Sequence, residues 1–265
     1  VYTGYSFLKS GLKIDQFLAK AKALELTTVG ISDFGNLSAA PVIFHEAKKQ
    51  GIRVIFGEDL LIDNLLFSLY VLNETGYKNL LKLSLEVEKD HASISLLKEL
   101  NEGLGVVLST QNDLLKQALL EDENKFALSL SKVARGIEHF YLGIEVNKEE
   151  NYLKTIREFA YSHGYQTIAF PFIKYVKPED AIVLEMMKAI ETKEVLDYKT
   201  LVGDEYFKTP EEIEKLYTKE EIENTEALAS LVNFEFVSQR GKMISWEKET
   251  GEKGDEYLAK TAFEG

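Results

Sequence analysis

The sequence contains no cysteine, and this absence excludes three kinds of chemistry. Without thiols the chain cannot form disulfides, use a thiolate nucleophile or bind zinc through sulfur. Chains without cysteine are typical of reducing compartments, which favours a cytoplasmic location. No apolar run approaches the roughly 20 residues that span a bilayer, and residues 1–15 lack the layout of a signal peptide. We therefore expect a soluble protein without a membrane contact.

Histidine is also scarce, and the four histidines are His45, His91, His139 and His163. No two of them are two, three or four residues apart, which are the spacings that place two imidazoles on one strand face or one helix turn. Each is expected to be an ordinary surface histidine. The chain therefore cannot build a histidine-rich catalytic metal centre of its own.

Several other functional signatures are missing. No glycine-rich phosphate loop follows a predicted strand, and no serine lies in the Gly-x-Ser-x-Gly turn of a hydrolase. Basic residues are outnumbered, 31 against 44 acidic ones, which gives a formal net charge of −13. That charge argues against a broad basic patch for nucleic-acid phosphates, and we expect a solvated acidic surface.

Strand-like and helix-like apolar spacings alternate along residues 14–173. The predicted strands are 27–33, 53–62, 67–73, 105–110, 140–146 and 166–173. The predicted helices are 14–24, 37–50, 76–89, 112–120, 125–135 and 151–164. Uniformly apolar strands between amphipathic helices are typical of a parallel sheet covered by helices. A β/α barrel and a doubly wound sheet both fit, and the missing phosphate loop favours the barrel.

From about residue 178 the pattern is helical only. Thr209 and Thr218 each precede a glutamate by three residues, Glu212 and Glu221, which is the spacing of a capping box. The chain then becomes polar after about residue 240, until a helical pattern resumes at Tyr257. Two or three helices are therefore expected to close the domain before a linker enters a further element.

Acidic residues lie in or near three predicted strands. Asp33 ends the first, at the edge where β/α barrels carry their sites, Asp59 and Asp63 lie at or just beyond the next, and Glu145 lies late in the strand at 140–146. Asp33 and Asp59 could together hold Mg²⁺ or Mn²⁺. The simpler interpretation of Asp33 is that it caps the next helix or holds a loop.

Several segments together resemble a known family. They are 2–10, 30–37, 51–59, 168–176, 206–212 and 255–258, with the most specific one at Asn73-Glu74-Thr75-Gly76-Tyr77-Lys78-Asn79-Leu80. The chain resembles the PHP (polymerase and histidinol phosphatase) domain of the bacterial DNA polymerase III alpha subunit. The resemblance implies a distorted seven-stranded β/α barrel of the TIM-like PHP type with extra C-terminal helices. It places this domain at residues 1–240, and a linker with the start of the polymerase module at 241–265.

Members of that family with an intact site hold two or three metal ions through histidines, aspartate and glutamate, and this chain departs from that pattern. The positions matching their ligands carry Tyr2, Lys9, Phe34, Asp59, Leu66, Phe172 and Lys174. Asp59 alone keeps a suitable side chain, with Asp33 and Glu58 as possible residual acids. The resemblance therefore implies a degenerate site without catalytic residues or bound metal. We hypothesise that Lys9 or Lys174 pairs with Asp33 or Asp59.

The resemblance implies a non-catalytic scaffold or docking domain for DNA replication. The nucleotidyl transfer of the DNA-directed DNA polymerase, with its Mg²⁺, would lie beyond Gly265. The implied partners are the polymerase module of the same chain and a proofreading exonuclease or other replisome proteins, and a monomer is expected. The rival hypothesis is a metal-dependent phosphoesterase or 3′–5′ exonuclease with a reduced site. A third, an unrelated β/α barrel, is disfavoured by residues 73–84.

Overall fold

The computed structural model describes residues 1–146, 149–193, 203–236, 251 and 253–264. The chain divides into two compact units, Val1–Glu235 and Phe236–Gly265, each of which is described by itself. The second unit contains the helix α12 (Gly254–Glu264), none of whose residues is buried. Within the described ranges, no helix combines the length and the apolar character needed to cross a bilayer.

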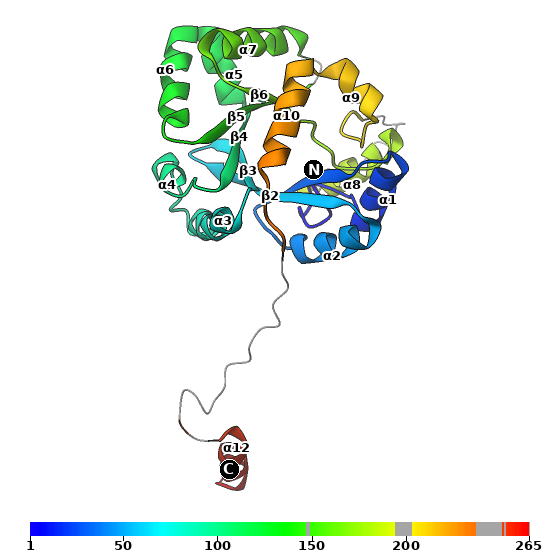
Figure 1. The fold of residues 1–265 in the computed structure, drawn as a ribbon, viewed down its shortest axis with the longest axis vertical. Helices are drawn as coiled ribbons and strands as arrows, with labels where there is room; N and C mark the ends of the chain where they lie inside the picture. The colour runs from blue at the N-terminus through cyan, green and yellow to red at the C-terminus, as the bar shows by residue number, and fades with distance from the viewer. Residues whose placement is uncertain (147–148, 194–202, 237–250, 252, 265) are drawn as a thin grey trace. The chain divides into compact units, whose positions relative to one another are not determined.

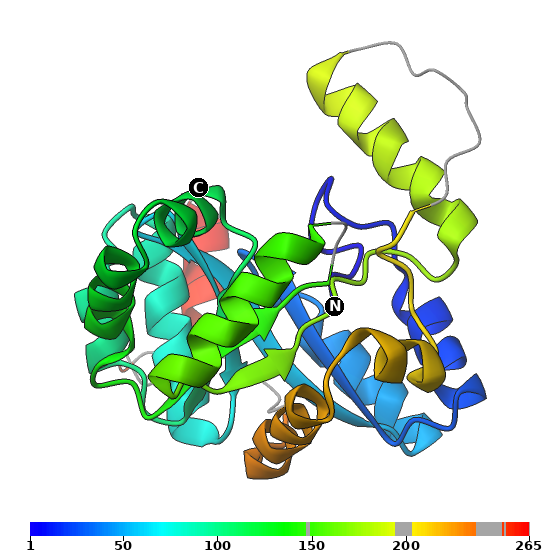
Figure 2. The same cartoon turned by 90° about the horizontal axis from the view of Figure 1, so that it is seen from above.

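The first unit is built on one curled sheet that forms a half-barrel (Figures 1 and 2). Its six strands are β1 (Thr28–Phe34), β2 (Arg53–Ile62), β3 (Leu65–Val71), β4 (Leu104–Ser109), β5 (His139–Ile144) and β6 (Thr167–Ala169). They lie side by side in chain order from β1 to β6. The described residues thus form a six-stranded sheet where a seven-stranded barrel was expected.

The sheet is mixed, so the prediction of a parallel sheet was wrong for one strand. β3 runs antiparallel to both β2 and β4, while the pairs β1/β2, β4/β5 and β5/β6 are parallel. Only Asp63 and Asn64 separate β2 from β3, and both have positive φ angles, 49° and 62°. Such a two-residue turn with left-handed residues closes an antiparallel hairpin, whereas a parallel connection needs a crossover of a dozen residues.

The predicted helices are confirmed, with shifts of a few residues at their ends. They are α1 (Ile14–Ala23), α2 (Ala40–Gln50), α3 (Glu74–Glu88), α5 (Asp113–Glu121), α6 (Glu123–Ala134), α7 (Glu150–His163), α8 (Ala181–Thr192) after the short η1 (Pro178–Asp180), α9 (Pro210–Leu216) and α10 (Lys219–Leu231). One further helix, α4 (Ile94–Glu99), was not predicted. The strand predicted at 166–173 ends at Ala169, shortly before Pro171, which has no N–H for a strand ladder.

Apolar side chains fill both faces of the sheet. The larger cluster joins one strand face to the covering helices, with Phe56, Phe67 and Leu108 among its fully buried members. The smaller cluster lies on the opposite face, which we call the inner face, and contains Ile55 and Leu228 of α10. α10 therefore packs across the inner face, as Figure 1 also shows. Because side chains alternate between the two faces of a strand, Asp59 lies on the inner face together with Ile55, which is four residues before it in β2.

The Asn-x-x-Gly segment at 73–76 has a clear structural basis. The side chain of Asn73 caps α3 by accepting a hydrogen bond of 3.0 Å from the Gly76 N–H. A Cβ atom on Gly76 would lie 1.8 Å from the carbonyl oxygen of Gly103, so only glycine allows this approach. The segment thus joins the start of α3 to the loop that leads into β4.

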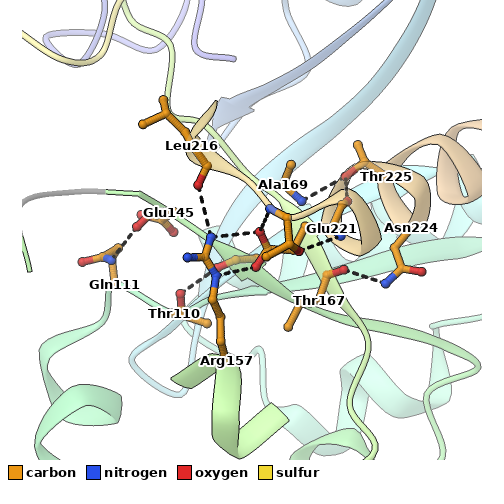
Figure 3. Close-up of polar contacts among 12 residues, drawn as sticks. Thr110, Gln111, Glu145, Arg157, Thr167, Ala169, Leu216, Glu221, Asn224 and Thr225 are labelled. Carbon is orange, nitrogen blue, oxygen red and sulfur yellow. Dashed lines mark hydrogen bonds and ion pairs between the residues drawn. The ribbon is translucent and has the colours of Figure 1, made fainter. Parts of the chain in front are cut away.

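Polar contacts fasten the closing helices, and Figure 3 draws those that join α10 to α7 and β6. Both predicted capping boxes, Thr209 with Glu212 and Thr218 with Glu221, are confirmed. Glu221 also accepts two hydrogen bonds from Arg157 of α7, at 2.7 and 2.9 Å. This bidentate pair ties α10 to α7.

β6 is an edge strand of the sheet, and side chains of α10 bond to the backbone groups at its outer edge. Asn224 donates to the Thr167 carbonyl at 2.9 Å, and the hydroxyl of Thr225 accepts from the Ala169 N–H at 3.0 Å (Figure 3). Polar groups on an edge strand otherwise invite another strand to pair. α10 therefore both fills the inner face and protects this edge.

Candidate functional site

The ends of the strands bring polar side chains together at one edge of the inner face. β1, β2, β4 and β5 reach this edge with their carboxyl ends and β3 with its amino end, because β3 is antiparallel. We call this edge the rim. In β/α barrels the corresponding edge carries the active site.

Asp59 lies at the rim and is bonded by two hydroxyl groups. The Tyr2 hydroxyl donates to Oδ2 at 2.7 Å, and the Ser68 hydroxyl donates to Oδ1 at 2.5 Å. Asp59 is fully buried. Burial raises the pKa of its carboxyl to about 6, although the hydrogen bonds from Ser68 and Tyr2 act in the opposite direction. Both oxygens of the one suitable ligand therefore already have partners within the protein.

Asp33 holds the N-terminal loop. It accepts hydrogen bonds from the Thr3 N–H at 2.6 Å, the Thr3 hydroxyl at 2.7 Å and the Ser6 hydroxyl at 2.6 Å. The simpler interpretation of Asp33 is confirmed in part, because it holds a loop. That loop is the one at residues 3–6, however, and the helix after Asp33 has Ala39 at its N-cap.

The hypothesis of a lysine pairing with these acids was wrong. Lys174 Nζ lies 2.6 Å from Glu205 Oε1, and Lys9 Nζ lies over the ring of Phe34, 4.4 Å from its centroid. In the described part of the chain, neither ammonium group pairs with Asp33 or Asp59. The physical reason is that hydroxyl and amide donors already occupy those carboxylates.

Glu58 does not belong to the rim. It is adjacent to Asp59 in β2 and therefore points to the opposite face, where the Ser84 hydroxyl of α3 donates to its Oε1 at 2.9 Å. Its Oε2 is buried without a hydrogen-bond partner among the described residues. Burial raises the pKa of this carboxyl to about 7. Of the two possible residual acids, neither Asp33 nor Glu58 joins Asp59 in one cluster.

Glu145 is the second acid of the rim. The alternation of strand residues could have predicted this position from the sequence. It follows β5 directly and accepts a hydrogen bond of 2.5 Å from the Ser109 hydroxyl. Burial, reinforced by the nearby charge of Asp59, raises its pKa to about 8. At neutral pH Glu145 is therefore mainly protonated. The side chain of Gln111 fixes its backbone by donating to the Glu145 carbonyl (Figure 3).

Apolar side chains occupy the remaining expected ligand positions. The ring of Phe172 packs edge-on against Tyr2, with 5.3 Å between the ring centroids. Leu66 lies inside β3, opposite Leu61 of β2, rather than before the strand. Phe34 is the last residue of β1 and accepts the Lys9 ammonium on its ring. These groups offer no lone pairs to a metal ion.

A cavity of about 600 Å³ opens beside Glu145. Its lining includes Glu145, Phe172, Tyr175, Glu205, Lys208 and Tyr217. Lys208 points its ammonium toward the Asp204 carbonyl and lies over the ring of Tyr206, and Lys174 is engaged by Glu205. The cavity therefore has room for a small molecule, and the ammonium groups of Lys174 and Lys208 beside it already have partners within the protein.

The residues at the rim do not fit a bound metal ion. Within the described ranges, no three His, Cys, Asp or Glu side chains lie close enough together to hold a metal. A multinuclear hydrolytic site needs several such ligands and an open position for water. Here each oxygen of Asp59 already accepts a hydrogen bond from a hydroxyl group, and Glu145 accepts one from Ser109.

Comparison with known proteins gives consistent results. A model of the PHP domain family matches residues 1–149. The DNA polymerase III subunit alpha of Rickettsia conorii is 32% identical over 238 residues, which cover 82% of this chain and 20% of that protein. The subunit from Buchnera aphidicola is 27% identical over 293 residues, covering 100% of this chain and 25% of that protein. The chain thus spans about a fifth to a quarter of the length of these relatives.

Among solved structures, a candidate metal-dependent phosphoesterase from Bifidobacterium adolescentis matches with a TM-score of 0.44 at 10% identity, over 62% of this chain and 82% of that chain. The resemblance expected from the sequence motifs is confirmed by the family match and by the curated relatives. The chain is homologous to the N-terminal region of DNA polymerase III subunit alpha, and it belongs to the PHP domain family.

Proposed function

We propose that this chain serves DNA replication as a non-catalytic PHP scaffold of a DNA polymerase III alpha subunit, with a degenerate metal site. The observation that carries the proposal is the bonding of Asp59, whose two oxygens are occupied by Tyr2 and Ser68. In this account Tyr2, Lys9, Phe34, Leu66, Phe172 and Lys174 replace former ligands. Hydrogen bonds and aromatic packing then hold the rim without a metal ion.

The proposed domain limits are residues 1–240 for the PHP domain, with its helical closing segment from about 178, and 241–265 for a linker and the start of the polymerase module. The seventh strand of the barrel would lie at the N-terminal segment. The Val1 carbonyl accepts from the Ser32 N–H of β1 at 3.0 Å, and the Tyr2 N–H donates to the Ile173 carbonyl at 2.9 Å. This segment therefore joins β1, at one edge of the sheet, to the stretch of chain that follows β6, at the other.

The chemistry of nucleotidyl transfer, with Mg²⁺ on acidic residues, is assigned to a polymerase module outside this domain. The domain itself is expected to need no cofactor, to be monomeric and cytoplasmic, and to make no strong direct contact with nucleic acid, because its formal net charge is −13. Its proposed partners are that polymerase module and a proofreading exonuclease or other replisome proteins.

Hydrolysis assays test this proposal against its rival, a residual phosphoesterase or 3′–5′ exonuclease. The purified chain is incubated with single-stranded DNA and with a phosphomonoester in Mn²⁺, Zn²⁺ or Mg²⁺, beside an Asp59→Ala variant. The scaffold predicts equal background rates for both proteins. Metal-dependent hydrolysis that disappears in Asp59→Ala would establish the rival.

The length of the reading frame gives a second test, because a scaffold within a polymerase requires hundreds of codons after Gly265.

A further inference from the structure

Helix α10 crosses the inner face of the sheet with little of its surface buried (Figure 1). Only Glu221 and Leu228 are buried among its thirteen residues, and one of the two is charged. α7, with fourteen residues, buries five apolar or aromatic ones. Because most of the stability of a helix in a protein comes from the packing of an apolar face, α10 must be held by contacts at particular points.

A cleft of about 520 Å³ lies between α10 and the strands that it crosses. Thr225, Leu228 and Ala229 line it from the helix, and Ile55 and Ile168 line it from the sheet. Protein interiors are otherwise closely packed, and a side chain beside a gap loses dispersion contacts. The packing beneath α10 is therefore looser than that of a filled core.

The first half of α10 is fastened by polar contacts, which we call the first latch. Arg157 of α7 donates two hydrogen bonds to Glu221, at 2.7 and 2.9 Å, and the Glu221 side chain is 1% exposed (Figure 3). Glu221 also closes the capping box with Thr218. One turn further along, Asn224 and Thr225 bond to the backbone of β6. The first latch thus joins α10 to α7 and to the edge of the sheet.

Residues 232–234, directly after α10, form a second latch. The Asn233 N–H donates to the Leu72 carbonyl at 2.6 Å, just after the end of β3. The Val232 carbonyl accepts a hydrogen bond from the guanidinium of Arg53, the first residue of β2. Backbone groups of the second latch are therefore bonded to two neighbouring strands.

Phe234 anchors the second latch. Its ring lies among those of Phe44 from α2, Phe56 from β2 and Tyr77 from α3, at centroid distances of 6.5, 5.4 and 5.3 Å. Aromatic side chains bury large areas, and tilted or edge-to-face contacts between rings add further attraction. One side chain thus ties the end of α10 to three elements of the first unit.

We propose that residues 219–234 form a strap that opens and closes as one unit over the half-barrel, while the sheet beneath stays folded. The strap is fastened at both ends and loosely packed between them, and segments with few buried apolar contacts open at a lower free energy than the core. Opening uncovers the outer edge of β6 and the apolar side chains of the inner face. The second unit follows the strap in the chain, so a pull on that unit acts first on Phe234.

Amide hydrogen exchange of the 265-residue chain, followed by mass spectrometry at several urea concentrations below the unfolding transition, tests the proposal. After correction for intrinsic rates, we expect the amides of α10 to exchange at least about tenfold faster than those of β4, whose six residues are all buried. The exchange of α10 should also depend less steeply on urea, because opening the strap exposes less surface than global unfolding does.

Substitution of the anchor tests whether the strap is one unit. Phe234→Ala should raise the exchange of the whole of α10 by one common factor of about ten or more, with the amides near Glu221 affected as strongly as those near Phe234. Phe234→Leu keeps an apolar side chain and should give the same pattern with a smaller factor, which preserves the test if Phe234→Ala does not fold. Leu128→Ala on α6, where Leu128 is 66% exposed, is the control and should leave the exchange of α10 unchanged.

Two results would overturn the proposal. If α10 exchanged at the rate of β4 and with the same dependence on urea, it would open only when the whole first unit unfolds. If Phe234→Ala and Phe234→Leu raised the exchange of the last turn of α10 alone, the two latches would hold separate pieces of chain and no common strap would exist. Neither result depends on whether the rim binds a metal ion, so the proposed function is tested separately.

Discussion

The hydroxyl of Tyr2 lies 2.7 Å from Oδ2 of Asp59, and both side chains are buried at the rim of the sheet. The phenol donates a hydrogen bond to a carboxyl group that, in the proposed ancestry, faced a metal ion. This contact gives Asp59 a partner within the protein, while the ring of Phe172 packs against that of Tyr2.

Replacing Tyr2 tests the energetic value of this contact. Tyr2→Phe keeps the ring packing but leaves Oδ2 of Asp59 without its donor, so we expect a loss of about 1–3 kcal/mol in the free energy of unfolding. Urea denaturation at neutral pH measures it. Tyr70→Phe is the matched control, because its hydroxyl lies 3.4 Å from the Ser32 hydroxyl and contributes a weaker contact. Equal losses in the two variants would contradict the assignment.

The stability of the domain should fall as pH rises. Burial raises the pKa of Asp59 to about 6, of Glu58 to about 7 and of Glu145 to about 8, above their ordinary values of 3.8, 4.5 and 4.5. The folded chain thus retains protons that the unfolded chain has released. For each of these carboxyl groups, the free energy of unfolding falls by about 1.4 kcal/mol for each unit by which the pH rises between the ordinary pKa and the raised pKa.

We therefore expect full stability below about pH 4 from these groups and a progressive loss up to about pH 8. Urea denaturation from pH 5 to pH 8.5 gives the slope. Glu145→Gln, which cannot ionise, should make the curve less steep by about 1.4 kcal/mol per pH unit over the whole range from pH 5 to about pH 8. A curve for Glu145→Gln parallel to that of the parent chain would show that Glu145 does not retain its proton.

The pair of Arg157 and Glu221 should be essential for holding α10. Glu221 is 1% exposed at its side chain and Arg157 is 29% exposed. Removing the guanidinium in Arg157→Ala leaves a buried carboxylate, and we expect a loss of about 2–3 kcal/mol, below the value for a fully buried pair because water reaches Arg157. Thermal or urea unfolding measures it.

Two other substitutions on α7 calibrate that result. Lys154→Ala removes an exposed pair with Glu158, at 3.8 Å, and should change stability by less than about 0.5 kcal/mol. Arg157→Lys keeps the charge but loses the bidentate geometry, so an intermediate loss is expected. If Arg157→Ala behaved like Lys154→Ala, the pair would not hold the helix.

Gly76 should tolerate no side chain. In Gly76→Ala the new methyl group would lie 1.8 Å from the Gly103 carbonyl oxygen, so the start of α3 must move, and we expect a loss of about 2–4 kcal/mol. Gly30→Ala is the control, because the nearest atom to its new methyl group is 4.0 Å away. Urea denaturation compares the two. Equal stability of both variants would show that α3 adapts freely.

Much of the fold could be predicted from periodicity. The amphipathic spacing of helices such as α1 and α7 and the capping boxes at Thr209 and Thr218 depend on local sequence, and the structure contains them. The direction of β3 depends on a single turn, and the residues Asp63 and Asn64 would have indicated a hairpin had the strand been extended back to Leu65. α4, with six residues, is too short for a periodic signal.

The candidate site could be located but not described from the sequence. Three of the positions that the resemblance singled out, Tyr2, Asp59 and Phe172, lie together at the rim, and the alternation of β2 would have separated Glu58 from Asp59. The partners of the acids could not be foreseen, because Thr3, Ser6 and Ser68 are small hydroxyl residues without a distinctive pattern. Lysines appeared to be the natural partners by charge alone, yet Lys174 bonds to Glu205 instead.

The metal content of the purified chain tests the central claim most directly. The chain is dialysed against Zn²⁺ and Mn²⁺ in turn, freed of loose ions, and measured by inductively coupled plasma mass spectrometry, with Asp59→Ala beside it. We predict far less than one ion per chain in both proteins, because Tyr2 and Ser68 occupy Asp59. One or more ions per chain that disappear in Asp59→Ala would contradict the account.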